Sequence, residues 1–174
     1  DEVAAHLHRV EGQAPAVHIA PGLRCLRRSG DPDVMRGEET KILGWVSLDP
    51  ARAKGRQVLC LPGTHNKWVL VEDGRIVRFV TAMSGELFDL LSHHGVLKAG
   101  DDAIDDPKAL AQGIERGAEP GSLAAKLFTA RSRVVGGDMA RASEGPYLSG
   151  LLIGDEVASL PAMLGADGVT QIGL

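Results

Sequence analysis

The sequence contains few aromatic residues, few cysteines and no long hydrophobic run. Aromatic residues make up 3% of the 174 residues, so a core must be built from aliphatic side chains. No stretch approaches the roughly 18 apolar residues that a membrane span needs. The net charge of −4 is spread along the chain, without the basic stripe of a nucleic-acid binder. The sequence therefore predicts no membrane and no nucleic-acid partner.

The two cysteines, Cys25 and Cys60, lie far apart and match no metal-binding spacing. Such sparse use of cysteine is typical of reduced thiols in a reducing compartment. With 44% hydrophobic and 24% charged residues, the composition is that of an ordinary globular protein. We therefore predict a cytoplasmic location.

Both ends of the chain have the pattern of interrupted elements. Val3, Leu7 and Val10 follow helical spacing, which predicts a helix from the first residues that stops at Gly12. Residues 168–174 predict a turn and a buried strand that ends without a partner. We therefore expect the chain to be a fragment.

The first third of the chain favours short strands followed by one helix. Residues 15–26 alternate loosely and predict one or two strands, and residues 36–48 predict a helix that Asp49-Pro50 closes. The polar stretch 51–56 marks a domain boundary. We predict a first domain that ends at residue 56 and a second domain over residues 57–174.

The second domain opens with three antiparallel strands. Residues 57–61, 67–71 and 75–81 are apolar runs of strand length, and Asp73-Gly74 is a strong hairpin signal. Ser84 is a good N-cap for the next helix. Downstream, the sequence predicts helices from Asp106-Pro107, from Ser122 and over residues 147–164.

The turn after the first of these strands is a candidate phosphate site. In Leu61-Pro62-Gly63-Thr64-His65-Asn66-Lys67, a tight Gly-Thr turn exposes backbone N–H groups of the kind that bind phosphate oxygens. The Thr64 hydroxyl adds a donor, Lys67 a positive charge, and His65 a second side chain that faces the same phosphate. An ordinary hairpin turn with an exposed histidine is the alternative.

A cluster of acids precedes the predicted helix at residues 36–48. Asp33, Glu38 and Glu39 stand near Arg36 at a loop-to-helix junction, where a carboxylate can deprotonate a hydroxyl. The alternative is a helix N-terminus that acids stabilise through the helix dipole. Gly37-Glu38-Glu39 resembles a segment of exopolyphosphatases in which a glutamate is catalytic.

A third candidate is Thr81-Ala82-Met83-Ser84-Gly85-Glu86-Leu87-Phe88, at the end of the third strand. Ser84 and Glu86 are expected on the first turn of the next helix, where they cap that helix or, by resemblance to sugar kinases, contact substrate hydroxyls. His93 and His94 point to different helix faces without a partner at ligand spacing, which excludes a zinc site there.

Taken in order, these motifs resemble the 2-dehydro-3-deoxygalactonokinase family. The resemblance rests on Pro32 to Thr40, Leu61 to Val69, Phe79 to Phe88 and Tyr147 to Gly154. Asn66 and Ser84 replace the Ser and Thr of many members. The resemblance implies an α/β, actin/hexokinase-like (ribonuclease H-like) two-domain kinase fold, here as the end of the first domain and most of the second.

The resemblance also implies a reaction, in which the γ-phosphate of ATP passes to the C6 hydroxyl of 2-dehydro-3-deoxy-D-galactonate. Mg²⁺ is then held by the nucleotide, with no direct metal ligand in this chain. Catalysis falls to Glu38, Glu39 or Asp33. Phosphate or ATP contacts fall to Gly63, Thr64, His65, Lys67 and Gly173, the last near the adenosine. Substrate contacts fall to Arg36, Thr81, Ser84 and Glu86.

Two other functions stay open on the sequence. A phosphohydrolase of the same superfold would share the acids and the Gly-Thr turn, with water in place of the sugar hydroxyl. A non-catalytic sugar-binding regulator would carry a DNA-binding module elsewhere. Among the three carboxylates, Glu38 is favoured as the base by its place at the entry to the predicted helix, although the sequence does not decide among them. The sequence also leaves a homodimer open.

Overall fold

A mixed sheet forms the centre of the first of two compact units. The computed structural model describes residues 6–98, 104–166, 169 and 172–174. Contacts divide the chain into unit 1, which comprises residues 1–61, 67–81 and 168–174, and unit 2, which comprises residues 62–66 and 82–167.

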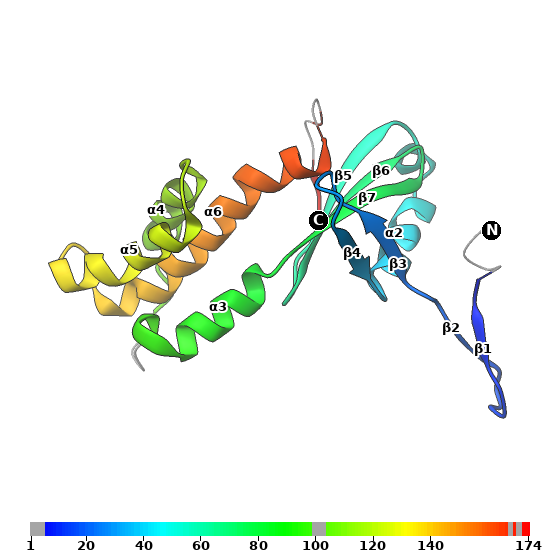
Figure 1. Cartoon of the computed structure of the whole chain (residues 1–174), viewed down its shortest axis with the longest axis horizontal. Coiled ribbons are helices and arrows are strands. Elements are labelled where there is room, and N and C mark those ends of the chain that lie inside the picture. The colour runs from blue at the N-terminus through cyan, green and yellow to red at the C-terminus, as the bar shows by residue number, and fades with distance from the viewer. Residues whose placement is uncertain (1–5, 99–103, 167–168, 170–171) are drawn as a thin grey trace. The chain divides into compact units, whose positions relative to one another are not determined.

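The sheet of unit 1 has the strand order β7-β6-β5-β8 (Figure 1). β5 (Arg56–Leu61) pairs antiparallel with β6 (Asn66–Glu72), with Leu59 opposite Val69. β7 (Arg75–Ala82) follows a turn in which Asp73 and Gly74 both have positive φ, 47° and 75°. This backbone suits a two-residue hairpin loop, so the predicted three-stranded meander is confirmed.

The last strand joins the sheet from a distance in the sequence. β8 (Ile172–Gly173) runs parallel to β5, with Gly173 opposite Leu59. A Cβ atom at Gly173 would lie 2.5 Å from Leu59 Cδ2, so glycine allows this close approach. The predicted terminal strand is therefore present at residues 172–173, but the expectation that it lacks a partner is wrong, because it pairs with β5.

A ribbon and a helix complete the core of unit 1. β3 (Leu23–Leu26) and β4 (Pro32–Met35) pair antiparallel, and α2 (Glu38–Ser47) follows as predicted. A short 3-10 helix, η1 (Pro50–Ala53), then begins after Asp49, whose side chain accepts from Ala51 N. The buried apolar side chains are Met35, Ile42, Leu59, Val69, Val71 and Phe79.

The helix predicted at the beginning of the chain is wrong over the residues that the structure describes. β1 (His8–Val10) pairs antiparallel with β2 (Val17–Ile19), with Arg9 opposite His18. Residues 1–5, including Val3, lie outside the described residues. The apolar spacing was misleading because β1 and β2 are mostly exposed, so no buried face set the spacing of their apolar residues.

The predicted domain boundary between residues 56 and 57 stays a prediction about the family fold. Within this chain, the contacts group most of β5, β6 and β7 with the segment that precedes them. The reason is packing: Leu59, Val69 and Phe79 share one core with Met35 and Ile42.

Unit 2 is helical. α3 (Ser84–His93) and η2 (Gly95–Leu97) precede α4 (Pro107–Ala118) and α5 (Leu123–Gly136), and η3 (Arg141–Ser143) leads into α6 (Glu144–Leu164). The core contains Leu97, Ala109, Ala130, Tyr147, Leu148 and Leu151. None of the helices in the described part of the chain is both long and apolar enough to cross a membrane.

Glycines set the close crossing of α4 and α6, which lie side by side (Figure 1). A Cβ atom at Gly113 would overlap the Tyr147 carbonyl oxygen, and one at Gly150 would overlap that of Leu110. Gly117 and Gly154 are equally tight against backbone atoms of the opposite helix. Gly150 and Gly154 therefore allow the close packing of α6 on α4.

The helix starts agree with the sequence in part. Asp106 caps α4, because its side chain accepts from Lys108 N and Ala109 N. Ser84 was predicted as an N-cap, but the cap position is Met83 and Ser84 is the first helical residue. The Ser84 hydroxyl instead bonds to Glu156 of α6, a partner that no local pattern reveals.

Candidate functional site

The turn at residues 62–66, called the Gly63 turn below, belongs to unit 2. Gly63 N donates to Asn66 Oδ1 at 2.7 Å, and Thr64 O accepts from Glu86 N at 2.9 Å. Thr64 and His65 are exposed. Within the described residues, the Thr64 hydroxyl and the N–H groups of Thr64 and His65 have no hydrogen-bond partner. Three donors of one turn therefore face solvent.

The side chains around the Gly63 turn are carboxylates and their donors. His65 Nε2 lies 2.5 Å from Glu86 Oε2, and both side chains are partly exposed. Glu156 of α6 accepts from Asn66 Nδ2 at 3.0 Å and from the Ser84 hydroxyl. Sequence reasoning missed Glu156. The available signal was an acid on an otherwise apolar helix face, where α6 also buries Leu152 and Leu160.

The acids at the start of α2 belong to unit 1 and differ in burial. Glu38 is partly exposed, and its Oε2 accepts from Arg36 N at 3.1 Å. Glu39 is 2% exposed, and its Oε2 accepts from Gly37 N at 2.6 Å. The other Glu39 oxygen, Oε1, is buried without a partner among the described residues. Glu38 is thus accessible, whereas Glu39 holds the backbone of its own helix start.

Asp33 was predicted in a loop, but it lies on β4 and is buried. Its carboxylate accepts from the Thr81 hydroxyl at 2.6 Å and from Thr81 N at 2.8 Å, and it pairs with Arg27 at 2.6 Å. Burial raises the pKa of Asp33, but the hydrogen bonds from Thr81 and the charge of Arg27 outweigh it and hold the pKa below its ordinary value. Asp33 is therefore an ionised anchor between β4 and β7.

Lys67 belongs to the same network in unit 1. It is buried, and its Nζ donates to Val34 O at 2.9 Å and to the Thr81 hydroxyl at 2.8 Å. The Lys67 ammonium group, predicted to bind a phosphate, therefore forms hydrogen bonds to β4 and β7 in this structure. Thr81, predicted to bind substrate, likewise bonds to Asp33 and Lys67.

Gly173 lines a cavity of about 540 Å³ within unit 1. Trp45 and three basic residues, Arg52, Lys54 and Arg56, line the same cavity, and the Arg52 guanidinium lies 4.8 Å from the Trp45 ring centre. The basic side chains suit an anionic group, and the indole ring suits a planar one. Its place beside Gly173 agrees with an adenosine contact there, which stays a prediction.

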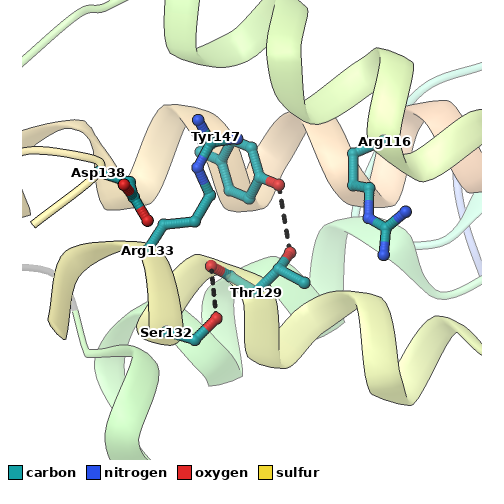
Figure 2. Close-up of a pocket in the computed structure, with 6 residues that line it drawn as sticks. All are labelled: Arg116, Thr129, Ser132, Arg133, Asp138 and Tyr147. Atoms are coloured by element: carbon teal, nitrogen blue, oxygen red, sulfur yellow. Dashed lines mark hydrogen bonds between the residues drawn. The ribbon is translucent and has the colours of Figure 1, made fainter. Parts of the chain in front are cut away.

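A second cavity, of about 440 Å³, lies among α4, α5 and α6 of unit 2 (Figure 2). The Arg133 guanidinium lies 5.0 Å from the Tyr147 ring centre, and the Tyr147 hydroxyl lies 3.2 Å from Thr129 Oγ1. The other lining residues are Arg116, Ser132 and Asp138. None of the residues predicted from the sequence for a functional site lines this cavity.

The predicted residues are divided between the two units. Unit 1 holds those of the acid cluster, of β6 and β7 and of β8: Asp33, Arg36, Glu38, Glu39, Lys67, Thr81 and Gly173. Unit 2 holds those of the Gly63 turn and of α3: Gly63, Thr64, His65, Ser84 and Glu86. Over the described ranges, no three His, Cys, Asp or Glu side chains form a group that could hold a metal ion.

Comparison with known proteins identifies the family. The model of the 2-keto-3-deoxy-galactonokinase family matches residues 1–174. The chain therefore belongs to this family of sugar-acid kinases.

Two curated relatives carry the name of the same family. The 2-dehydro-3-deoxygalactonokinase of Escherichia coli (strain K12) is 39% identical over 145 residues, which cover 83% of this chain and 48% of the relative. The Rhizobium meliloti (strain 1021) protein named Probable 2-dehydro-3-deoxygalactonokinase DgoK1 is 37% identical. The match covers 99% of this chain and 59% of that relative. The chain spans about half the length of these curated relatives.

A solved structure supports the fold. A crystal structure of a Sinorhizobium meliloti protein, assigned as a 2-dehydro-3-deoxygalactonokinase, is 36% identical and superposes with a TM-score of 0.85. The match covers 98% of this chain and 56% of that one. The mixed α/β architecture is therefore shared with a relative over almost the whole chain.

Proposed function

We propose that the protein containing this chain transfers the γ-phosphate of ATP to the C6 hydroxyl of 2-dehydro-3-deoxy-D-galactonate, as a step of D-galactonate breakdown in the cytoplasm. The observation that carries the proposal is the Gly63 turn, whose Thr64 hydroxyl and two N–H groups face solvent without a partner among the described residues. The family membership supports the same reaction. The proposed setting is an actin/hexokinase-like two-domain fold.

The residues present fit a nucleotide phosphate at the Gly63 turn. Unengaged N–H groups and a hydroxyl on a short exposed turn are donors of the kind that bind phosphate oxygens. The N–H of Gly63 itself is engaged by Asn66, so we assign the contacts to Thr64 and to the backbone of His65. Mg²⁺, brought by the nucleotide, would neutralise charge on the phosphates during transfer.

We assign the general base to Glu38. Its side chain is partly exposed, whereas Glu39 is buried and the Asp33 carboxylate accepts several hydrogen bonds. A base must reach the proton that it removes, so accessibility favours Glu38. Arg36 is exposed beside it and is the proposed partner for the substrate carboxylate.

The test of the function is release of ADP by the longest reading frame that contains this chain. With MgATP present, we expect ADP release to depend on added 2-dehydro-3-deoxygalactonate, and the phosphorylated product to be detectable by mass spectrometry. ADP release that is equal with and without the sugar acid would identify a phosphohydrolase instead. Stimulation by other sugars alone would refute the proposed substrate.

The role of the Gly63 turn is tested by Thr64→Val, which removes a hydroxyl from an exposed side chain at almost constant shape. We expect turnover to fall by about 10²–10³-fold, the usual loss when one transition-state donor is removed. The melting temperature should not change. An unchanged turnover number would show that the turn is only structural.

A further inference from the structure

Glu156 lies on the buried face of α6 and reaches two segments that are distant in the sequence. It is 6% exposed, and both carboxylate oxygens lie 3.0 Å from Asn66 Nδ2. The Ser84 hydroxyl donates to the same carboxylate. One side chain therefore connects the Gly63 turn, the first residue of α3 and α6, all within unit 2.

The carboxylate of Glu156 fixes the orientation of the Asn66 amide. An ionised carboxylate only accepts hydrogen bonds, so the Asn66 NH₂ group must point toward Glu156. Asn66 Oδ1 then points to the other side, where it accepts from Gly63 N at 2.7 Å. If the Asn66 amide were rotated by 180°, its Oδ1 would face the Glu156 carboxylate and its NH₂ group would face the N–H of Gly63, so both hydrogen bonds would be lost. Glu156 thus ensures that Asn66 presents its Oδ1 to the N–H of Gly63.

The first turn of α3 packs against the backbone of the Gly63 turn. Glu86 N donates to Thr64 O at 2.9 Å, and a Cβ atom at Gly85 would overlap Gly63 O and lie 2.9 Å from Thr64 Cα. Through Ser84, Glu156 holds the residue with which this helix begins. The position of Thr64 is therefore defined from two sides, by Asn66 and by α3, and Glu156 contacts both.

We propose that Glu156 is a positioning residue for the phosphate contacts of the Gly63 turn, acting through Asn66 and Ser84. The proposal rests on the proposed function of that turn. A carboxylate near a nucleotide phosphate opposes binding by like-charge repulsion, so direct contact with the phosphate is not its contribution. Its contribution is to hold the hydroxyl and N–H groups in place, where a displacement of about 1 Å can cost about 10²-fold in rate.

The test compares variants of the longest reading frame that contains this chain, at saturating sugar acid. We expect Glu156→Ala and Asn66→Ala each to lower kcat/KM for MgATP by about 10- to 100-fold. The double variant should lose less than the product of the two single losses, because both single variants remove the Glu156–Asn66 contact. Glu156→Gln keeps an amide oxygen for Asn66 and should restore most of the activity.

The matched control is Asp155→Asn, one residue away on α6. Asp155 Oδ1 pairs with buried Lys126 at 2.9 Å, and its loss should lower the melting temperature without changing KM for MgATP. The proposal is overturned if Glu156→Ala stays within about threefold of wild type in kcat/KM. It is also overturned if the control loses kcat/KM to the same extent, or if the effects of Glu156→Ala and Asn66→Ala simply add.

Failure of the proposed function can be told apart from failure of this inference. If wild type shows no ADP release that depends on the sugar acid, the proposed function fails, and MgADP binding is then measured by calorimetry. Binding weakened by about tenfold or more in Glu156→Ala, but not in Asp155→Asn, still supports the positioning role. Equal binding in Glu156→Ala and wild type, or no binding in wild type, overturns it.

Discussion

Among the residues that the structure describes, four acidic side chains are almost fully buried, and their partners differ. Asp33 accepts hydrogen bonds from Thr81 and pairs with Arg27, and Glu156 accepts from Asn66 and Ser84. Glu39 has one oxygen engaged and one without a partner, and both oxygens of Glu144 lack one among the described residues. A buried carboxylate without donors is unfavourable when ionised. Partners, rather than burial alone, therefore indicate what each acid does.

The first prediction at this scale concerns the general base. Glu38→Gln should lower kcat by about 10²–10⁴-fold, since an amide cannot take the proton of the hydroxyl. Asp33→Asn should lower the melting temperature instead, because its carboxylate joins β4 to β7. Turnover and thermal melting are measured for Glu38→Gln, Glu39→Gln and Asp33→Asn separately. If all three keep turnover within a few-fold of wild type, the base lies elsewhere in the protein.

The second prediction concerns Glu144, at the first residue of α6. Burial raises the pKa of Glu144, and the charges of Arg131 and Arg141 offset only part of that rise. The Glu144 carboxyl binds its proton more tightly in the folded state than in the unfolded state. Protonation of Glu144 therefore stabilises the fold at acidic pH, and this stabilisation is lost as pH rises through the raised pKa.

Glu144→Gln should therefore melt higher than wild type at pH 8, with a difference that shrinks as pH falls toward 4.5. Melting temperatures at half-unit pH steps provide the measurement. Parallel pH profiles for the two proteins would show that Glu144 does not titrate in this way.

At the scale of elements, the crossing of α4 and α6 depends on glycine rather than on large side chains. Gly113 and Gly117 of α4 meet Gly150 and Gly154 of α6, and each lies against backbone atoms of the other helix. A methyl group at these positions has no free volume, because both sides of the contact are backbone.

We predict that Gly150→Ala lowers the free energy of unfolding by about 1–3 kcal/mol or more, the usual cost of overpacking. Gly145→Ala is the matched control in the same helix, because nothing lies within 4 Å of its added Cβ. Gly145→Ala should be neutral or stabilising by up to about 1 kcal/mol. Urea unfolding measures both variants, and equal losses would contradict the role of the crossing.

At the scale of the whole molecule, this chain spans about half the length of the curated relatives that it matches. Each unit described here contains its own candidate residues: the proposed base, Glu38, is in unit 1, and the proposed hydrogen-bond donors to phosphate, Thr64 and His65, are in unit 2. Phosphoryl transfer needs both kinds of group, since the nucleophile must be aligned while the phosphate charge is stabilised.

Nucleotide binding gives the prediction at this scale. For the longest reading frame, MgADP at about 100 times its Kd should stabilise the folded state by about 2.7 kcal/mol, and the melting temperature should rise accordingly. A polypeptide of residues 1–174 should show a smaller rise in melting temperature. The reason is that we expect part of the nucleotide contacts to be made by segments that correspond to the unmatched half of the relatives. An equal rise for both would place the nucleotide contacts within residues 1–174.

Much of the fold could be predicted because local residues determine it. Asp73-Gly74 sets the β6–β7 hairpin through its positive φ values, Asp106 starts α4 through its own hydrogen bonds, and the apolar face of residues 36–48 produces α2. Each of these signals acts within a few residues. The motif order was likewise enough to predict the family, which the family model confirms over residues 1–174.

Tertiary structure decided the partners of the site residues. Asn66 and Ser84 meet Glu156 across 90 and 72 positions of sequence, and Asp33 meets Thr81 across 48. A hydrogen bond of this kind depends on how helices and strands pack, so no spacing rule reveals it. The same packing buried Lys67, which looked like a phosphate ligand beside the Gly63 turn. The sequence determined which residues are candidates for the chemistry, and packing determined which of these candidates are exposed.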